Sequence, residues 1–167
     1  MTGSGKTTLG EKLAKMLGIQ HVSRSYKEFV NSNEELMKFL KDVPDEFVRK
    51  FDAEIRREAK SADSVVSSWL GPWLIKESTL NVLLEASFEV RTDRVAKARK
   101  ITAKEAREYV KDKDLRFIEE VKRVYGINIA EESGRFDLKI DTERMSQEEI
   151  TAIIALASIE KNKKIFG

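Results

Sequence analysis

The sequence contains no cysteine and a single histidine, His21, among its 167 residues. The absence of cysteine excludes disulfide bonds, thiolate nucleophiles and metal sites with cysteine ligands. The one histidine lies in a short apolar run without a partner in the sequence, so neither a Ser-His-Asp triad nor a multi-histidine zinc site is supported. Chemistry must therefore depend on lysine, arginine, serine, threonine and carboxylate side chains. A cysteine-free chain also suits the reducing cytoplasm, where we expect the protein to act.

Long apolar runs are absent as well. No segment approaches the roughly 20 apolar residues needed to span a bilayer, and the charged, glycine-containing start, residues 1–12, is unlike a signal peptide. We therefore expect no membrane partner. Neither sign of charge predominates, because the chain has 31 basic and 29 acidic residues. This balance argues against a specific nucleic-acid partner, and the length suits one compact domain, expected to be a monomer.

The first residues do carry a recognisable pattern. They match the end of the phosphate-binding motif G-x-x-x-x-G-K-[ST], in which backbone N–H groups and a helix N-terminus hold phosphate oxygens. The candidate nucleotide-binding residues are Gly3, Ser4, Gly5, Lys6, Thr7 and Thr8. Within this set, Lys6 is expected to reach the β- and γ-phosphates of ATP, and the Thr7 hydroxyl to bind Mg²⁺. A merely flexible polar terminus is the alternative, but an amphipathic helix follows at once, which favours the phosphate loop.

The motif is incomplete at its start. Its first glycine would precede Met1 by one residue, and the strand that delivers such a loop to the sheet is missing from the sequence. We therefore expect the reading frame to continue upstream into a short apolar strand that ends in glycine. Without that strand, the strands on either side of it would lack hydrogen-bond partners, and the domain would be unstable.

Hydrophobic spacing predicts alternating helices and strands. Leucines at helical spacing predict a helix from Lys6 to Gly18, and residues 25–60 are expected to be helical and charged, with a break at Pro44. Further helices are predicted over 88–100, from a capping box at 102–105 toward Gly126, and after a second capping box at 146–149. Strands are predicted near 19–22, 64–69, 80–86 and 136–140. This order predicts an α/β fold with a parallel sheet flanked by helices.

Beyond the loop, the chain resembles the short archaeal cytidylate kinases, which belong to the nucleoside monophosphate kinases of the P-loop NTPase superfamily. The resemblance depends on the order and spacing of several stretches, which are GSGKTTLGEKLAKMLG, FDAEIRREAK, VVSSWLGPWLIK, EVRTDRVAKARK, KRVYGINI and FDLKIDTERMSQEEI. It implies an adenylate kinase-like fold in which residues 1–167 form one P-loop kinase domain. Within it, residues 25–62 would form a helical arm that binds the nucleoside monophosphate, and 99–135 would form a lid.

The resemblance also implies roles for arginines in a segment that is richer in basic than in acidic residues, from Arg91 to Tyr125. Arg94 and Arg116 are the expected catalytic arginines beside Lys6, and Arg99 is expected to contact ATP. Bidentate guanidinium groups are suited to stabilising charge during phosphoryl transfer. A solvated helix face is the alternative for this segment. Asp141 and Thr142, between the last strand and the last helix, would lie near the adenine of ATP, with an ordinary turn as the alternative.

Two departures from the family pattern affect the acceptor site. Related enzymes have Ser-Ala-Gly-Asp-x-x-Arg after the second strand, where this chain has Ser-Arg-Ser-Tyr-Lys-Glu-Phe, residues 23–29. They also have Glu-Gly-Arg after the third strand, where this chain has Ser67, Ser68 and Trp69. The expected acceptor-site aspartate, glutamate and arginines are therefore lost, and Trp69 is expected to pack in the core or pocket wall rather than to stack on a base.

These observations predict Mg²⁺-dependent transfer of the ATP γ-phosphoryl group to a nucleoside monophosphate, with CMP or dCMP as the leading acceptor. The reaction needs positioning and charge neutralisation rather than a general base, which suits a chain with one histidine. The alternative is a nucleotide-binding regulator or degenerate paralogue without turnover, which the lost acceptor residues favour. A GTPase is disfavoured because the guanine signature Asn-Lys-x-Asp does not occur.

Overall fold

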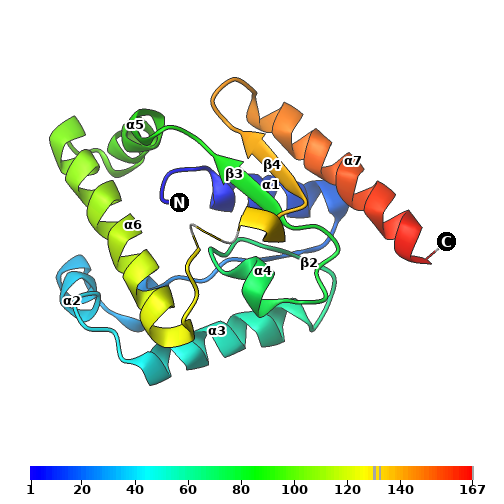
Figure 1. Cartoon of the computed structure of the whole chain (residues 1–167). Helices are drawn as coiled ribbons and strands as arrows, with labels where there is room; N and C mark the ends of the chain where they lie inside the picture. Colours follow the sequence, from blue (N-terminus) through cyan, green and yellow to red (C-terminus); the bar gives the residue numbers. More distant parts are fainter. Residues whose placement is uncertain (130, 132, 167) are drawn as a thin grey trace.

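Helices and strands alternate along the chain in the order that the sequence predicts (Figure 1). The computed structural model describes residues 1–129, 131 and 133–166, so positions 130 and 132 of the predicted lid and position 167 lie outside the described residues. The elements are α1 (Lys6–Leu17), β1 (Gln20–Val22), η1 (Tyr26–Phe29), α2 (Asn33–Phe39), α3 (Asp45–Ala59), β2 (Ser64–Val66), α4 (Gly71–Leu74), β3 (Val82–Glu85), α5 (Phe88–Arg99), α6 (Ala103–Tyr125), η2 (Ser133–Arg135), β4 (Leu138–Asp141) and α7 (Gln147–Phe166).

The predicted helix boundaries are confirmed where the sequence carries a cap. Helix α1 ends at Gly18 in the left-handed conformation, with a φ of 67°. Helix α6 begins with a reciprocal capping box between Thr102 and Glu105, and ends at Gly126, with a φ of 68°. Pro44 precedes α3 in an extended conformation and separates it from α2, because proline cannot donate a helical hydrogen bond.

Two local expectations need correction. The strand predicted near 64–69 ends at Val66, and the short helix α4, Gly71–Leu74, was not expected. Pro72 lies in the first turn of α4, where a missing N–H group costs nothing, so the chain turns into a helix instead of extending the strand. The predicted helical arm comprises the three segments η1, α2 and α3, and the predicted break at Pro44 lies between the last two.

The strands form two separate parallel pairs rather than one sheet. Strand β1 pairs with β2, with Gln20 opposite Ser64, and β3 pairs with β4, with Val82 opposite Leu138. In the part of the chain that the structure describes, no strand joins β2 to β3. The predicted parallel pairing is therefore confirmed within each pair, but the described strands form two sheets instead of the single sheet predicted.

The main hydrophobic core lies between the β3–β4 pair and helices α1 and α7. Leu13 of α1, Leu84 of β3 and Ile150 of α7 are buried members of this cluster. A second cluster packs the arm against β1, where Val22 contacts Phe51 and Ile55 of α3. Because α1 is fixed by this core, the loop before it has a defined position near the ends of β2 and β3.

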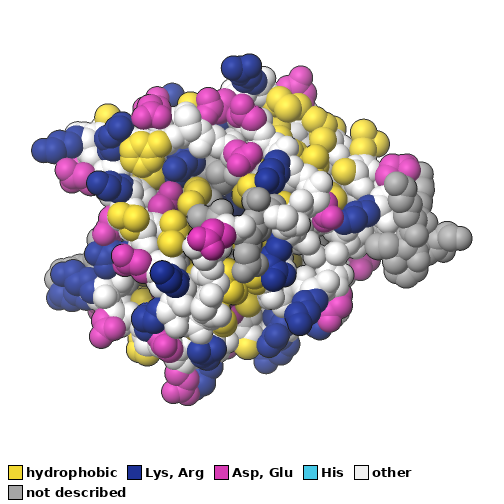
Figure 2. Space-filling view, viewed as in Figure 1, with side chains coloured by type: hydrophobic (Ala, Val, Ile, Leu, Met, Phe, Trp, Pro, Cys, Tyr) yellow, Lys and Arg dark blue, Asp and Glu magenta, His cyan; other side chains and the backbone are white. Residues whose placement is uncertain are grey.

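Helix α6 connects distant parts of the molecule. In Figure 1 it runs along one side of the protein from α5 to α3, and it contacts both helices. Basic and acidic side chains are interspersed over the face shown in Figure 2, as the balanced composition leads one to expect. Among the described residues, no helix combines the length and apolar character needed to cross a membrane.

Candidate active site

The first five residues form a tight loop that leads into α1. Gly3 and Gly5 both adopt the left-handed region, with φ angles of 77° and 93°. A Cβ atom on Gly3 would lie 2.6 Å from the carbonyl oxygen of Arg91, which is closer than a side chain can approach backbone. Gly5 occupies the position before the first residue of α1. Glycine is therefore required at Gly3 by conformation and by space, and the loop places the N-terminus of a twelve-residue helix at a concave surface.

Lys6 folds back over this loop. Its Nζ atom donates to the carbonyl oxygen of Met1 at 2.7 Å and to Oγ of Ser4 at 3.4 Å, and Ser4 is almost fully buried. The Nζ atom also lies 4.9 Å from the ring centroid of Trp69. Burial lowers the pKa of Lys6 to about 8. The ammonium group is thus held inside the loop with few compensating charges, where an anionic ligand would stabilise it.

Thr7 and Thr8 follow on the first turn of α1 and are exposed. A hydroxyl group at this position can serve Mg²⁺, which takes few protein ligands when it also binds substrate phosphates. Among the described residues, no group of three histidine or acidic side chains forms a separate metal-binding cage. The Thr7 hydroxyl, exposed on the first turn of α1, is open to a ligand.

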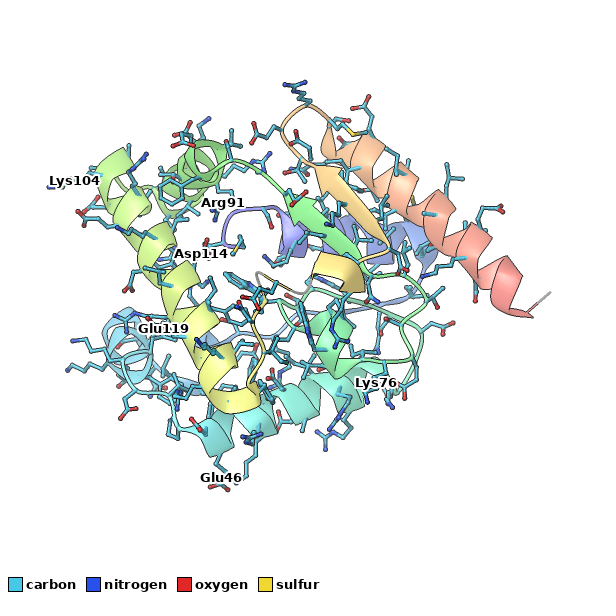
Figure 3. The ribbon with its side chains drawn as sticks, in the orientation of Figure 1. Glu46, Lys76, Arg91, Lys104, Asp114 and Glu119 are labelled. Atoms are coloured by element: carbon cyan, nitrogen blue, oxygen red, sulfur yellow. The ribbon has the colours of Figure 1, made fainter. Side chains whose placement is uncertain are left out.

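A buried ion pair between α5 and α6 also contacts the first residues of the loop. Nη1 of Arg91, on α5, donates to Oδ2 of Asp114, on α6, at 2.6 Å, and to the carbonyl oxygen of Thr2 at 3.0 Å (Figure 3). The backbone N–H of Thr2 donates to Oδ1 of Asp114 at 3.0 Å. The side chains of Arg91 and Asp114 are only 11% and 12% exposed. The start of the phosphate loop is therefore joined to both α5 and α6 by charge-assisted hydrogen bonds.

The two predicted arginines of α5 point to different partners. Arg94 donates through Nη1 to the Thr142 hydroxyl at 2.8 Å and through Nη2 to the Thr142 carbonyl at 2.6 Å. Thr142 is buried and bonds in turn to Glu85, at the end of β3. Arg99 donates to the Tyr109 hydroxyl at 2.7 Å and lies over its ring. Arg94 thus reaches the turn expected near adenine, whereas Arg99 joins α5 to α6 away from the loop.

Arg116 contacts the arm rather than the phosphate loop. Its Nε donates to Asp112 at 2.7 Å and its Nη1 to the carbonyl oxygen of Leu40 at 3.1 Å. Further hydrogen bonds join the C-terminal half of α6 to η1 and α3, from Tyr26 to Glu120 at 3.0 Å and from Tyr125 to Asp52 at 2.7 Å. Burial raises the pKa of the Asp52 and Glu120 carboxyl groups. Helix α6 therefore links the phosphate loop to the arm.

The segment after β2 closes the site with small and aromatic side chains. Oγ of Ser67 donates to the carbonyl oxygen of Lys6 at 3.0 Å and lies 2.9 Å from Nε2 of His21. Trp69 packs against Phe117 of α6, with ring centroids 4.1 Å apart. Trp69 therefore packs between Phe117 and Lys6, as expected of a side chain in the core or a pocket wall. His21, which had no expected role, is a hydrogen-bonding neighbour of Ser67.

Arg24 lies in the segment 23–29, where the acceptor-site arginine of related enzymes is missing. Its guanidinium group contacts two carboxylates, Glu28 at 3.0 Å and Glu54 at 2.6 Å. These ion pairs raise the pKa of Arg24 above its ordinary value. Its charge is thus largely compensated by two carboxylates of the arm.

Sequence reasoning missed Asp114 entirely. It stands within a charged helical run, four residues after the buried Val110 and therefore on the same face of α6. Only the tertiary packing brings it to Thr2 and Arg91. The contact between Trp69 and Phe117 joins residues 48 positions apart, and no local pattern announces it. The short-spacing signals that the structure confirms are those of local conformation, such as the helix ends at Gly18 and Gly126.

The chain has relatives among known proteins. The profile of the Cytidylate kinase-like family matches residues 1–144. The cytidylate kinases of Pyrococcus abyssi and Pyrococcus horikoshii are 34% and 32% identical to the chain over 163 residues, covering 94% of it and 89% and 84% of the relatives. The cytidylate kinase of Methanopyrus kandleri is 29% identical over 173 residues, covering 94% of this chain and 89% of that protein.

A solved structure shares the fold at low sequence similarity. The crystal structure of an uncharacterized protein from Eubacterium ventriosum superposes with a TM-score of 0.67 at 16% identity, covering 95% of this chain and 93% of that one. The family profile spans the phosphate loop, the arm, α5, α6 and β4. Together with the archaeal relatives, it shows that the chain belongs to the cytidylate kinase-like family.

Proposed function

We propose that the protein is a P-loop nucleoside monophosphate kinase that transfers the γ-phosphoryl group of ATP to CMP or dCMP. The observation that carries this proposal is the loop from Gly3 to Lys6, whose geometry suits a polyphosphate, within a chain of the cytidylate kinase-like family. The backbone N–H groups of the loop and the N-terminus of α1 would bind the phosphates. Lys6 would release its contact with Met1 and neutralise the β- and γ-phosphates.

Mg²⁺ would be bound by the Thr7 hydroxyl and the phosphates of ATP. Bound there, the ion would neutralise charge between the β- and γ-phosphates. The role of this chain is to fix Thr7 at the first turn of α1, next to Lys6, so that the ion and the ammonium group face the same polyphosphate. The acceptor phosphate is already an anionic nucleophile, so no side chain has to remove a proton from it.

The arginines would act from α5 and α6. Arg94 is bonded to Thr142 and would lie between the adenine end and the phosphates of ATP. Arg116 would be drawn from Leu40 and Asp112 toward the transferred phosphoryl group when the lid, residues 99–135, closes over the arm, residues 25–62. Arg99 would have to leave Tyr109 to contact ATP. Each of these roles requires one or two existing hydrogen bonds to be exchanged for bonds to phosphate.

The residues expected to bind the acceptor favour a second function. Trp69 stands where related enzymes have an arginine, and Arg24 is paired with Glu28 and Glu54. An acceptor phosphate would therefore contact the ring of Trp69 and the guanidinium group of Arg24, which is already paired with two carboxylates. Such a guanidinium group is less available for two parallel hydrogen bonds to the phosphate. This arrangement supports a nucleotide-binding regulator that retains the ATP site without turnover.

One experiment separates these functions. ADP release is measured with ATP and Mg²⁺ in the presence of CMP, dCMP, UMP, AMP or GMP, and ATP binding is measured in parallel by calorimetry. Turnover with CMP or dCMP above the acceptor-free rate supports the kinase. ATP binding without turnover for any acceptor supports the regulator, and absence of ATP binding contradicts both.

Variants of α1 provide the matched control. Lys6→Ala should abolish turnover, because it removes the point charge on the phosphates, while the circular dichroism spectrum stays unchanged. Lys12→Ala, on the same helix, removes an exposed lysine that pairs with Glu148 and should leave turnover unaltered. Equal activity of both variants would contradict the proposed role of Lys6.

A further inference from the structure

The ring of Trp69 lies between the lysine of the phosphate loop and helix α6. Trp69 follows β2 at the carboxyl end of the strand, which is the end where ligands bind in parallel α/β folds. Its ring centroid is 4.9 Å from Nζ of Lys6 and 4.1 Å from the ring centroid of Phe117, on α6. Both aromatic side chains are half-buried. One aromatic pair therefore joins the expected lid to the ammonium group expected on the phosphates.

The backbone on both sides of Trp69 is held by hydrogen bonds. Before the ring, Oγ of Ser67 donates to the carbonyl oxygen of Lys6 at 3.0 Å. After it, the N–H of Leu70 donates to Oγ of Ser68 at 3.1 Å, and Leu70 is only 3% exposed. The main freedom left to the ring is rotation about its side-chain bonds. The contact with α6 restricts that rotation.

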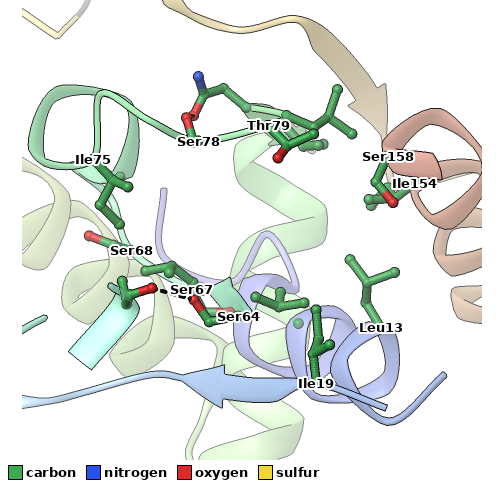
Figure 4. A pocket seen from close by; sticks show the side chains of 18 of the residues that line it. Leu13, Ile19, Ser64, Ser67, Ser68, Ile75, Ser78, Thr79, Ile154 and Ser158 are labelled. Carbon is green, nitrogen blue, oxygen red and sulfur yellow. Dashed lines mark hydrogen bonds between the residues drawn. The ribbon is translucent and has the colours of Figure 1, made fainter. Parts of the chain in front are cut away.

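Space for water lies on the other side of this segment. Ser67 and Ser68 line a pocket of about 710 Å³, and Lys6 is also part of its lining (Figure 4). The ring of Trp69, in contrast, packs toward α6. Solvent can thus come close to the loop from the pocket. The ring therefore determines whether water also reaches the ammonium group from the side of α6.

The neighbouring carboxylate is already engaged. Asp114 stands three residues before Phe117, next to it on the helix surface. Its Oδ1 accepts from the N–H of Thr2 at 3.0 Å, and its Oδ2 from Arg91 at 2.6 Å. The indole ring of Trp69 offers only one N–H donor. The wall formed by these side chains is therefore poorly suited to orienting or deprotonating a water molecule.

Water can compete with the acceptor for the phosphoryl group of ATP. In hydrolysis, a water oxygen bonds to the γ-phosphorus while the bond to the β–γ bridging oxygen breaks, which releases ADP and phosphate. One proton of the water stays on the phosphate, and the other passes to solvent. An acceptor phosphate brings its own anionic oxygen to the same phosphorus. Exclusion of water from this position therefore suppresses hydrolysis without blocking transfer.

We propose that Trp69 excludes water from the γ-phosphate of ATP, and that Phe117 is the positioning residue that holds the ring beside Lys6. The inference rests on the proposed binding of ATP by the phosphate loop. It gives α6 a further role, because the ring keeps this position only while α6 packs against it. A purely structural contact would stabilise the fold without changing the ratio of hydrolysis to transfer.

The position of the ring is tested by fluorescence. The chain has two tryptophans, so Trp73→Phe leaves Trp69 as the single emitter. In this background, Phe117→Ala should at least roughly double the quenching constant for acrylamide, because the ring loses the aromatic side chain that covers it. Leu115→Ala removes an exposed side chain of the same helix and should leave quenching unchanged.

Hydrolysis is measured as the release of inorganic phosphate from ATP and Mg²⁺ without an acceptor. At saturating ATP, Trp69→Ala and Phe117→Ala should each raise the rate at least roughly tenfold. Trp69→Phe keeps an aromatic face and should stay within about threefold of the parent. Leu115→Ala should keep the parent's rate. Addition of Lys6→Ala to Trp69→Ala should abolish the release, because the phosphate must come from the proposed site.

Transfer to CMP and ATP affinity are measured in parallel, so that this inference and the proposed function can fail separately. Unchanged phosphate release in both alanine variants, or release that persists without Lys6, overturns the inference even where the parent transfers phosphate to CMP. Loss of ATP binding in both alanine variants overturns it too, since the ring would then belong to the binding of ATP itself. A parent without transfer to any acceptor contradicts the kinase, but a rise confined to the two alanine variants would still support the exclusion of water.

Discussion

Asp114 and Arg91 form an ion pair at 2.6 Å that is nearly enclosed, and each residue also bonds to the backbone of Thr2. The pair joins α5 and α6 at the first residues of the phosphate loop. A movement of α6 relative to α5 would therefore change the surroundings of the loop. This relationship connects the part of the chain expected to act as a lid with the residues proposed to bind ATP.

Substitution of Asp114 should destabilise the protein far more than substitution of a surface carboxylate. Asp114→Asn leaves the Arg91 guanidinium without its counter-charge in a buried place, which costs about 3–5 kcal/mol. The free energy of unfolding, measured with urea, should fall by this amount.

Glu46→Gln is the matched control, since Glu46 forms an exposed pair with Lys50, four residues along α3, with both side chains more than 70% exposed. Its effect on the free energy of unfolding should stay below about 0.5 kcal/mol. Similar losses in the two variants would show that the Asp114 pair is not a buried structural contact.

Gly3 is expected to be essential for nucleotide binding. In Gly3→Ala the new Cβ would meet the Arg91 carbonyl oxygen at 2.6 Å, at a φ of 77°. The loop must then shift, and we expect the Kd for ATP, measured by calorimetry, to rise at least about tenfold, since roughly 1.4 kcal/mol of lost binding suffices.

Gly71→Ala serves as the control, because nothing lies within 4 Å of its added Cβ atom and its φ angle is not positive. It should leave ATP affinity unchanged. Tight ATP binding by Gly3→Ala would argue against the loop as the phosphate site.

The sequence predicts well what short-range interactions determine. Gly18 and Gly126 end helices because they adopt left-handed conformations, and the Thr102–Glu105 capping box starts α6 where expected. The turn that leads into α1 is local in the same sense, since Gly3 and Gly5 both adopt left-handed conformations just before the helix. Such features depend on the conformation of neighbouring residues and survive in any tertiary context.

Contacts between distant segments were not predictable in this way. Asp114 has an ordinary place in a charged helix, and its role depends on the packing of α6 against the loop. The split into two strand pairs depends on which edges meet, which hydrophobic patterns alone do not specify. Arg94 was expected at the site from the family resemblance, but its partner Thr142 follows only from the arrangement of α5 beside β4.

Arg94 and Arg116 should differ from a surface arginine in kinetics rather than in stability. Arg94→Ala and Arg116→Ala, tested separately, are expected to lower kcat at least roughly tenfold, the scale of one contact to charge that develops during transfer. Arg107→Ala, which removes an exposed arginine of α6, should leave kcat unchanged. A fall in melting temperature without a fall in kcat would assign Arg94 only to its contact with Thr142.

The pH dependence of ATP binding should report on Lys6. Burial lowers its pKa from 10.5 to about 8, so the folded, ligand-free protein disfavours the charged form relative to the unfolded chain. The charged form destabilises the folded state below pH 8, and this cost disappears as the pH rises from 8 to 10.5. ATP reverses the preference, because its phosphates stabilise the ammonium group. Its Kd should therefore rise roughly tenfold between pH 7 and pH 9, where about nine in ten Lys6 side chains are neutral.

Lys6→Met separates this effect from the titration of ATP itself. The variant should bind ATP weakly at both pH values, with a much smaller pH dependence, and should unfold at a higher temperature than the parent at pH 7, because no charge is buried. Lys12→Met changes an exposed lysine of the same helix and should retain the parent's tenfold dependence. If the parent and Lys6→Met show the same change in Kd between pH 7 and pH 9, Lys6 does not bind the phosphates of ATP.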